Sequence, residues 1–254
     1  MPKKRKKRRR RGGLGRLLRP LSIILAAITV VAALTLFFKV ETILVTGAGR
    51  YSAADIIAAS GVETGDNLVL LDRYRVSQRI YTALPYITDV RPKPKFPNTL
   101  EIEVTETQAA AAIQGAGGWW LLSTSGKILE AVDAPAAADY LQIKGIQAET
   151  PAVSSPAVLP EDSHLTAERL SALLTALATQ EALPRADALD CSDSRKLVLH
   201  YDGRLQVEMF YNADFDFKIT CMLSAVDKLE PNETGILRMT MEDDYEVHFI
   251  KSGG

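Results

Sequence analysis

The chain has 254 residues and a formal net charge of −1, which conceals a strong asymmetry: 11 of its 30 basic residues precede residue 38, and all 31 acidic residues follow it. Residues 39–254 therefore carry 19 basic and 31 acidic residues, a net charge of −12, which makes them poor candidates for binding polyanions such as nucleic acid. The only cysteines, Cys191 and Cys221, exclude a disulfide framework and are predicted to be buried small apolar residues.

A basic block and an apolar run follow each other at the N-terminus. The run over residues 21–38, LSIILAAITVVAALTLFF, has no charge and is just long enough to cross a bilayer core as a helix. By the positive-inside rule, the basic block orients this helix with the N-terminus in the cytoplasm and residues 39–254 outside. The membrane-orienting residues are Lys3, Lys4, Arg5, Lys6, Lys7, Arg8, Arg9, Arg10 and Arg11.

Two other interpretations of this segment remain open. A nuclear address or nucleic-acid tail would explain PKKRKK, but a basic block directly before a spanning helix is already explained by topology. A cleaved signal peptide has the same order of regions, yet its apolar part is usually shorter and ends at small residues, whereas this run ends in Phe37 and Phe38. The basic residues are also expected to attract anionic lipid.

A strand and two helices are predicted next. The stretch VETILVTG, residues 40–47, alternates and ends at Gly47, as is typical of a largely buried strand before a turn. Ser52 and Asp55 have the spacing of a capping box at the start of a helix, and Gly61 is a suitable residue to end that helix. Residues 73–84 form the second predicted helix, ended by Pro85. Its inward residues are expected to be Tyr74, Ile80, Tyr81 and Leu84.

The next segment, residues 85–106, predicts a hairpin with one charged and one apolar face. Basic residues face acidic ones, and apolar residues face apolar ones, only if Lys95 lies opposite Glu101 and Phe96 opposite Leu100. This register leaves residues 97–99 as the loop. Because Pro92 and Pro94 lack N–H donors, the first strand is expected at the edge of a sheet, with its charged face in water.

The order strand, helix, helix, strand, strand resembles the POTRA domain of the FtsQ/DivIB family of bacterial division proteins. The resemblance is carried by VETILVTG, by YSAADIIAASGVETGDNLVLLD at residues 51–72, and by FPNTLEIEVTE at residues 96–106. It continues more weakly through WWLLSTSGKILE and YLQIKGI, which resemble the opening of that family's second domain. The stretch TQAAAAI, residues 107–113, departs from the family pattern at the joint between the domains.

The predicted fold class is α+β, with a single N-terminal transmembrane helix, a POTRA domain of order β-α-α-β-β, and a second mixed α/β domain with an extended antiparallel sheet. Within the second domain, residues 166–180 predict a helix and residues 217–229 another. The strands KLVLHY and RLQVEMF, joined by Asp202 and Gly203, form the clearest hairpin, and residues 236–250 predict one or two closing strands. The predicted segments are a basic tail (1–20), the transmembrane helix (21–38), the POTRA domain (39–108), the C-terminal β-rich domain (109–250) and a tail (251–254).

The motifs of the common enzyme classes are missing from the sequence. The S-x-x-K, G-x-S-x-G and G-x-x-x-x-G-K-[ST] patterns do not occur, and the nearest match, TSGK at residues 124–127, lies in a predicted hairpin turn. The three histidines, His164, His200 and His248, have no second ligand at metal spacing. The sequence therefore predicts no catalytic residues, no metal, no cofactor and no enzyme activity.

An interaction protein is the remaining prediction, with strand edges as its binding sites. The resemblance implies that the last strands bind partners of the FtsB/DivIC and FtsL types. The chain would then be a non-catalytic bitopic scaffold at the division septum that supports septal peptidoglycan synthesis. It is expected to lie in the cytoplasmic membrane and to bind no nucleic acid. The POTRA part is a second candidate surface. The predicted partner-binding residues are Met239, Met241, Tyr245, Val247, Phe249 and Ile250.

Two alternatives belong to other functional classes. POTRA domains also precede outer-membrane barrels, but the residues after this one are too few and too irregular for the alternating barrel pattern. A membrane-anchored sensor or wall-binding receptor would require a concave polar pocket, which the sequence does not reveal.

Overall fold

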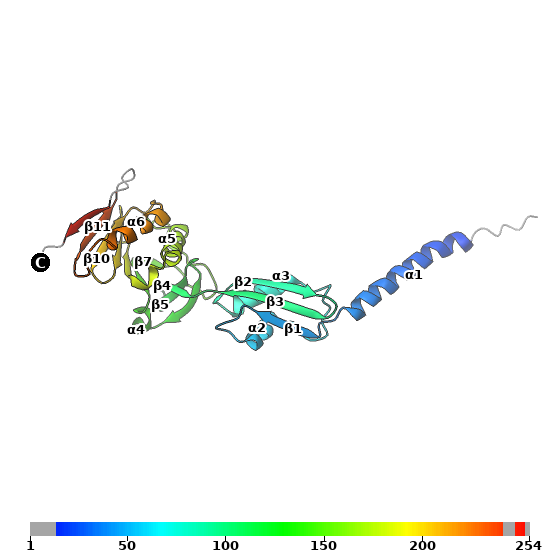
Figure 1. The fold of residues 1–254 in the computed structure, drawn as a ribbon. Helices are drawn as coiled ribbons and strands as arrows, with labels where there is room; N and C mark the ends of the chain where they lie inside the picture. Colours follow the sequence, from blue (N-terminus) through cyan, green and yellow to red (C-terminus); the bar gives the residue numbers. More distant parts are fainter. Residues whose placement is uncertain (1–13, 241–246, 252–254) are drawn as a thin grey trace, which may run out of the picture. The chain divides into compact units, whose positions relative to one another are not determined.

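The computed structural model describes residues 14–240 and 247–251 (Figure 1). After the N-terminal helix, the chain forms two compact units. Contacts within the chain assign residues up to 79 and residues 90–104 to the first unit, and residues 80–89 and those from 105 onward to the second. The predicted boundary between residues 108 and 109 stays a prediction.

The first helix, α1, spans Leu14–Phe37. In the part of the chain that the structure describes, no helix combines the length and the apolar character needed to cross a membrane. This finding contradicts the predicted transmembrane helix over residues 21–38. The apolar run is not a separate element, because α1 begins seven residues earlier and takes in Arg16, Arg19 and Pro20. The predicted membrane-orienting residues 3–11 lie outside the described residues.

The region from residue 42 to residue 106, most of which belongs to the first unit, has the predicted order of strands and helices. Its elements are β1 (Thr42–Thr46), α2 (Ala53–Ser60), α3 (Arg73–Ala83), β2 (Ile87–Lys95) and β3 (Thr99–Glu106). The sheet order is β1-β3-β2, with β1 parallel to β3. The predicted capping box is confirmed, since the Ser52 hydroxyl accepts from the Asp55 N–H at 3.1 Å and the Asp55 carboxylate accepts from the Ser52 N–H at 3.2 Å. Gly61 ends α2 with φ +63°.

Of the four residues predicted to face inward near α3, two are buried, Tyr81 is half-buried and one is exposed. Ile80 and Leu84 are buried as expected, and so is Val76, but Tyr74 is 74% exposed. Residues 76, 80 and 84 follow one another at intervals of four and share one helical face, whereas residue 74 points about 200° away from residue 76. The predicted inward position of Tyr74 was therefore wrong.

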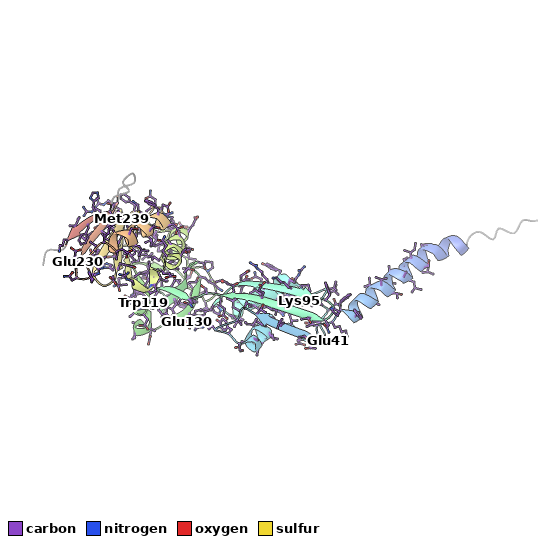
Figure 2. The ribbon with its side chains drawn as sticks, in the orientation of Figure 1. Glu41, Lys95, Trp119, Glu130, Glu230 and Met239 are labelled. Carbon is purple, nitrogen blue, oxygen red and sulfur yellow. The ribbon has the colours of Figure 1, made fainter. Side chains whose placement is uncertain are left out.

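The hairpin of β2 and β3 has the predicted register. Lys95 Nζ lies 2.8 Å from Glu101 Oε1, and Lys93 pairs with Glu103 one step further along. The Lys93 and Glu103 side chains are 52% and 44% exposed, so this face is solvated, as predicted. Strand β2 lies at the edge of the sheet. Figure 2 shows Lys95 near the end of β2.

The second unit is built on a nine-stranded sheet of order β12-β11-β10-β9-β8-β7-β4-β5-β6. Three of its pairings, β4–β7, β7–β8 and β10–β11, are parallel, which corrects the predicted antiparallel sheet. Parallel neighbours need a crossover, and α5 and α6 supply those between β7 and β8 and between β10 and β11. The strands are β4 (Ala109–Gly115), β5 (Gly118–Ser123), β6 (Ile128–Val132), β7 (Leu141–Ala148), β8 (Ala186–Asp190), β9 (Leu197–Tyr201), β10 (Leu205–Met209), β11 (Gly235–Met239) and β12 (His248–Lys251).

Helices α5 (Ala167–Thr179) and α6 (Phe215–Val226) form the core with one face of this sheet; the short elements α4 (Ala134–Ala137) and η1 (Leu183–Arg185) lie in connections. The helix predicted at residues 166–180 is confirmed as α5, whose buried leucines include Leu173 and Leu177. The predicted hairpin turn is also confirmed: Asp202 and Gly203 have φ +62° and +65° between β9 and β10. Strand β4 was not predicted, because its run of alanines has little strand propensity.

Candidate functional site

Strand β12 forms one end of the nine-stranded sheet. It pairs antiparallel with β11, placing Ile250 opposite Ile236 and His248 opposite Arg238. No strand among the described residues pairs with its other side. An edge of this kind presents backbone N–H and C=O groups to which another strand can bind.

The ladder on the inner side shows which groups of β12 point outward. Gly235 donates its N–H to the carbonyl of Arg204, the residue before β10, at 3.3 Å. Residues 235, 237 and 239 of β11 therefore bond to β10, and residues 236 and 238 bond to β12. In an antiparallel pair, directly opposed residues exchange both bonds or neither. Ile250 and His248 therefore bond to β11, and the backbone groups of Phe249 and Lys251 point away from the sheet.

The predicted partner-binding residues occupy different environments. Met239, on β11 (Figure 2), is 2% exposed and belongs to the core, and the half-buried Val247 and Phe249 pack against that core. Ile250 is 42% exposed. Met241 and Tyr245 lie outside the described residues. Of the described members of this set, Ile250 thus presents the most accessible side chain, while Phe249 presents backbone groups.

A buried carboxylate, that of Glu208, links strands β10 and β11 next to the β12 edge. Glu208 of β10 is 6% exposed, and its two oxygens accept from Lys196 Nζ at 2.6 Å and from Arg238 Nε at 3.0 Å. Burial disfavours the ionised form of Glu208, but the hydrogen bonds and charges of Lys196 and Arg238 outweigh it and lower its pKa. Arg238 is in turn the cross-strand neighbour of His248. Sequence reasoning missed this cluster, because its members are brought together only by the pairing of β9, β10 and β11.

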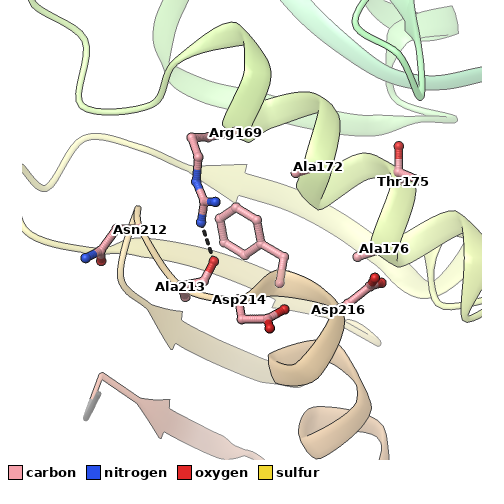
Figure 3. A pocket seen from close by; sticks show the side chains of 9 residues that line it. Arg169, Ala172, Thr175, Ala176, Asn212, Ala213, Asp214 and Asp216 are labelled. Carbon is pink, nitrogen blue, oxygen red and sulfur yellow. Dashed lines mark hydrogen bonds between the residues drawn. The ribbon is translucent and has the colours of Figure 1, made fainter. Parts of the chain in front are cut away.

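A surface hollow of about 500 Å³ lies between α5 and the loop from β10 to α6 (Figure 3). The Arg169 guanidinium enters from α5, where it donates from Nε to the Tyr211 carbonyl at 2.9 Å and from a terminal nitrogen to the Ala213 carbonyl, and it lies over the Phe215 ring at 4.5 Å. Asp214 caps α6 by accepting from the Phe217 N–H. These contacts hold the loop against α5, and the residues that line the hollow include no serine, cysteine, histidine or lysine.

Burial keeps two potentially reactive side chains of this unit, Cys191 and Tyr211, in their neutral forms. Burial raises the pKa of the Cys191 thiol to about 12. Burial also raises the pKa of the Tyr211 hydroxyl, which donates to the Asp193 carbonyl at 2.7 Å. Both groups are therefore neutral and poorly nucleophilic at neutral pH. Cys191 and Cys221 are free thiols, and the described residues hold no group of three or more potential metal ligands.

Comparison with known proteins identifies the first unit. Residues 38–107 match a family model described as "POTRA domain, FtsQ-type". The chain is 33% identical over 105 residues to the cell division protein FtsQ of Corynebacterium glutamicum, covering 41% of this chain and 47% of that protein. It is 26% identical over 207 residues to FtsQ of a Geobacter species, covering 78% and 70%.

A further relative, the cell division protein DivIB of Clostridium acetobutylicum, is 30% identical over 94 residues, which is 37% of each chain. The match spans about half the length of the C. glutamicum relative, whereas the Geobacter match extends well into the second unit. The family model covers residues 38–107, and the Geobacter match, at 26% identity, is long enough to reach beyond them into the nine-stranded unit.

Proposed function

Because the chain belongs to the FtsQ/DivIB family, we propose that it acts in bacterial cell division as a non-catalytic scaffold that assembles other division proteins at the septum and so supports septal peptidoglycan synthesis. The role in division follows from the family. The scaffold role, and partners of the FtsB/DivIC and FtsL types, are part of the proposal.

The observation that carries the scaffold role is the accessible edge of β12. A partner segment that pairs with β12 would bond to the outward groups of Phe249 and Lys251 and extend the sheet by one strand. Main-chain bonds of this kind supply affinity, and side chains at alternate positions supply specificity. The half-buried Val247 and Phe249 support the edge from the core side, because they pack against the core.

The side chains beside this edge favour a partner strand with an apolar residue. On the face opposite the core, Ile250 is 42% exposed and lies next to Ile236, while Arg238 and His248 form the next row. An incoming strand would place alternate side chains next to Ile250 on this face. The proposed site keeps the six predicted residues Met239, Met241, Tyr245, Val247, Phe249 and Ile250. Ile250 is its side-chain contact, and the buried Met239 supports the edge from the core.

Crosslinking in living cells tests this assignment. A photoreactive amino acid is placed at Ile250 and, as a control, at Ala131, an exposed residue of β6 at the opposite edge of the same sheet. We expect Ile250 to capture a small division protein of the FtsB/DivIC type and Ala131 not to capture it. Equal capture at both positions, or capture of glycan alone at Ile250, would contradict the scaffold role of this edge.

A second pair of variants separates backbone from side chain. Lys251→Ala removes only a side chain, which pairs with Glu233 at 3.2 Å, whereas Lys251→Pro also removes an outward N–H without affecting the bonds to β11. We expect the proline variant to bind the partner at least tenfold more weakly than the alanine variant, as measured with the purified proteins. Equal affinities would argue against strand addition.

A further inference from the structure

The two edges of the POTRA sheet differ in their ability to accept another strand. Strand β2 carries Pro92 and Pro94, which remove N–H donors and hinder pairing at that edge. Strand β1, at the other edge, reads TILVT and contains neither proline nor charge. Edge strands commonly carry such residues to prevent association, so their absence from β1 indicates an edge at which pairing is tolerated.

The backbone of β1 presents a short and well-defined set of outward groups. Thr42 donates its N–H to the Asn98 carbonyl at 3.3 Å, which starts the parallel ladder with β3. Since bonds to one neighbour come from alternate residues of a strand, Thr42, Leu44 and Thr46 bond to β3, and the N–H and C=O groups of Ile43 and Val45 point outward. No strand among the described residues pairs with them.

The chain on either side of β1 is not accessible to a further strand. Before β1, the Val40 N–H donates to the Asp66 carbonyl at 2.8 Å and the Leu68 N–H to the Phe38 carbonyl at 2.9 Å. After β1, the chain turns at Gly47, where φ is +84° and an added Cβ would lie 2.1 Å from the Val104 carbonyl oxygen. An incoming strand therefore has access to the five residues of β1.

We propose that β1 pairs antiparallel with β1 of a second copy of this chain, about a two-fold axis at Leu44. The sequence TILVT is nearly symmetric about that residue: Thr42 meets Thr46 of the other copy, Ile43 meets Val45, and Leu44 meets Leu44. Ile43 and Val45 then form hydrogen-bonded pairs, so that all of their outward groups are satisfied in both copies.

Other two-fold registers satisfy fewer of these groups. An axis at Ile43 places Val45 opposite Glu41, whose N–H is already bonded to the Asn98 carbonyl at 2.8 Å. An axis at Val45 places Ile43 opposite the turn residue Gly47. The Leu44 register also brings together no like charges, and it covers a leucine side chain that is 45% exposed in the single chain.

The small size of the contact predicts weak association. Five residues a side bury far less than the roughly 1,200–2,000 Å² typical of stable interfaces, so the dimer forms where the chain is locally concentrated. This contact goes beyond the proposed scaffold function and is independent of it, because β1 and β12 belong to different sheets.

Cysteine crosslinking of the full chain tests the register directly. Opposed residues of a non-hydrogen-bonded pair have Cα atoms about 4.5 Å apart, within disulfide range, so Leu44→Cys should form a covalent dimer under mild oxidation. Thr42→Cys and Thr46→Cys should crosslink when the two variants are mixed and not when each is alone, because residue 42 lies about 13 Å from its own copy. The unmodified chain, with Cys191 and Cys221, is the control.

Sedimentation velocity over a concentration series supplies the second measurement. Leu44→Lys sets two like charges directly opposite each other and should weaken dimerisation at least tenfold, while Leu70→Lys, at a 71% exposed position of the same unit, should leave it unchanged. A chain that stays monomeric throughout, a dimer that Leu44→Lys does not weaken, or crosslinking of Leu44→Cys to a different protein alone would each overturn the proposal.

Discussion

The cluster around Glu208 gives a prediction for the stability of the sheet behind the β12 edge. Glu208→Gln keeps the size of the side chain but removes the charge that Lys196 and Arg238 share. Breaking a fully buried pair costs about 3–5 kcal/mol. Since the Lys196 and Arg238 side chains are 29% and 45% exposed and can rehydrate, we expect a smaller loss of about 2 kcal/mol, near that of hydrogen bonds to a charged group.

Urea unfolding of the full chain measures this loss. Gln206→Ala is the matched control, because Gln206 lies two residues away on the same strand and is exposed, and its replacement should change the free energy of unfolding by less than about 0.5 kcal/mol. If Glu208→Gln were no more destabilising than Gln206→Ala, the carboxylate would not hold these strands together.

The natural chain and Glu208→Gln should differ in the acid sensitivity of their folded states. The pKa of Glu208 is lowered in the folded chain from its ordinary value of 4.5, so the unfolded chain binds the proton first as the pH falls. The stability that Glu208 contributes is therefore present above about pH 5 and is lost as the pH falls from 4.5 through the folded-state pKa. The difference in unfolding free energy between the natural chain and Glu208→Gln should shrink at pH 4; a constant difference from pH 7 to pH 4 would refute this cause.

Other predictions concern single side chains. Leu173→Ala, at a fully buried position of α5, should lower the free energy of unfolding by about 2–5 kcal/mol in urea titration, and a loss below 1 kcal/mol would mean that the core is not packed there. Ser52→Ala should remove the cap of α2 and cost about 1 kcal/mol by the same assay, with Ser52→Asn restoring it. Lys95→Ala should cost less than about 1 kcal/mol despite the 2.8 Å contact with Glu101, because Lys95 is 56% exposed; a larger loss would show that the pair is structural. The Cys191 thiol, with its pKa raised to about 12, should react with iodoacetamide at pH 8 only after unfolding, as followed by mass spectrometry; labelling of the folded chain at Cys191 would contradict its burial.

Features that depend on a few neighbouring residues could be predicted from the sequence. The cap at Ser52 is set by one turn of backbone and two side chains, and the turn at Asp202 and Gly203 by residues that tolerate positive φ. The register of Lys95 and Glu101 follows from alternation alone, because a slip of one residue would place charge in the core.

Features that depend on distant parts of the chain could not be predicted in this way. Tyr74 was predicted to face inward, yet the buried face of α3 is formed by Val76 and Ile80. The helix at residues 217–229 was predicted, but the parallel pairing of β10 with β11 across it depends on contacts between distant segments of the chain. The limits of α1 likewise depend on residues before the apolar run, and a count of uncharged residues alone gave the wrong element.

The candidate site was also predictable from the sequence only in part. The sequence placed it in the closing strands through a family resemblance, but which atoms are accessible depends on the sheet. Phe249 is part of the apolar support, and its backbone groups, not its ring, face outward. Arg238 and Glu208 enter the surroundings of the site only because three strands align.

In each sheet, the edge proposed to bind a strand lies opposite an edge that is hindered. In the POTRA sheet, Pro92 and Pro94 hinder β2 while β1 remains accessible. In the larger sheet, the start of β6 is covered by the 154–157 segment, since the Ile128 N–H donates to the Ser155 carbonyl at 2.8 Å and the Ile128 carbonyl accepts from the Ser154 N–H at 2.9 Å, while β12 has no such cover among the described residues. A sheet that is hindered on one side accepts a strand only on the other, which limits growth into a fibre. For β12 this leaves one side of the chain's own sheet for a partner strand. For β1 the two-fold pairing closes the edge in both copies at once and leaves only the hindered β2 edges.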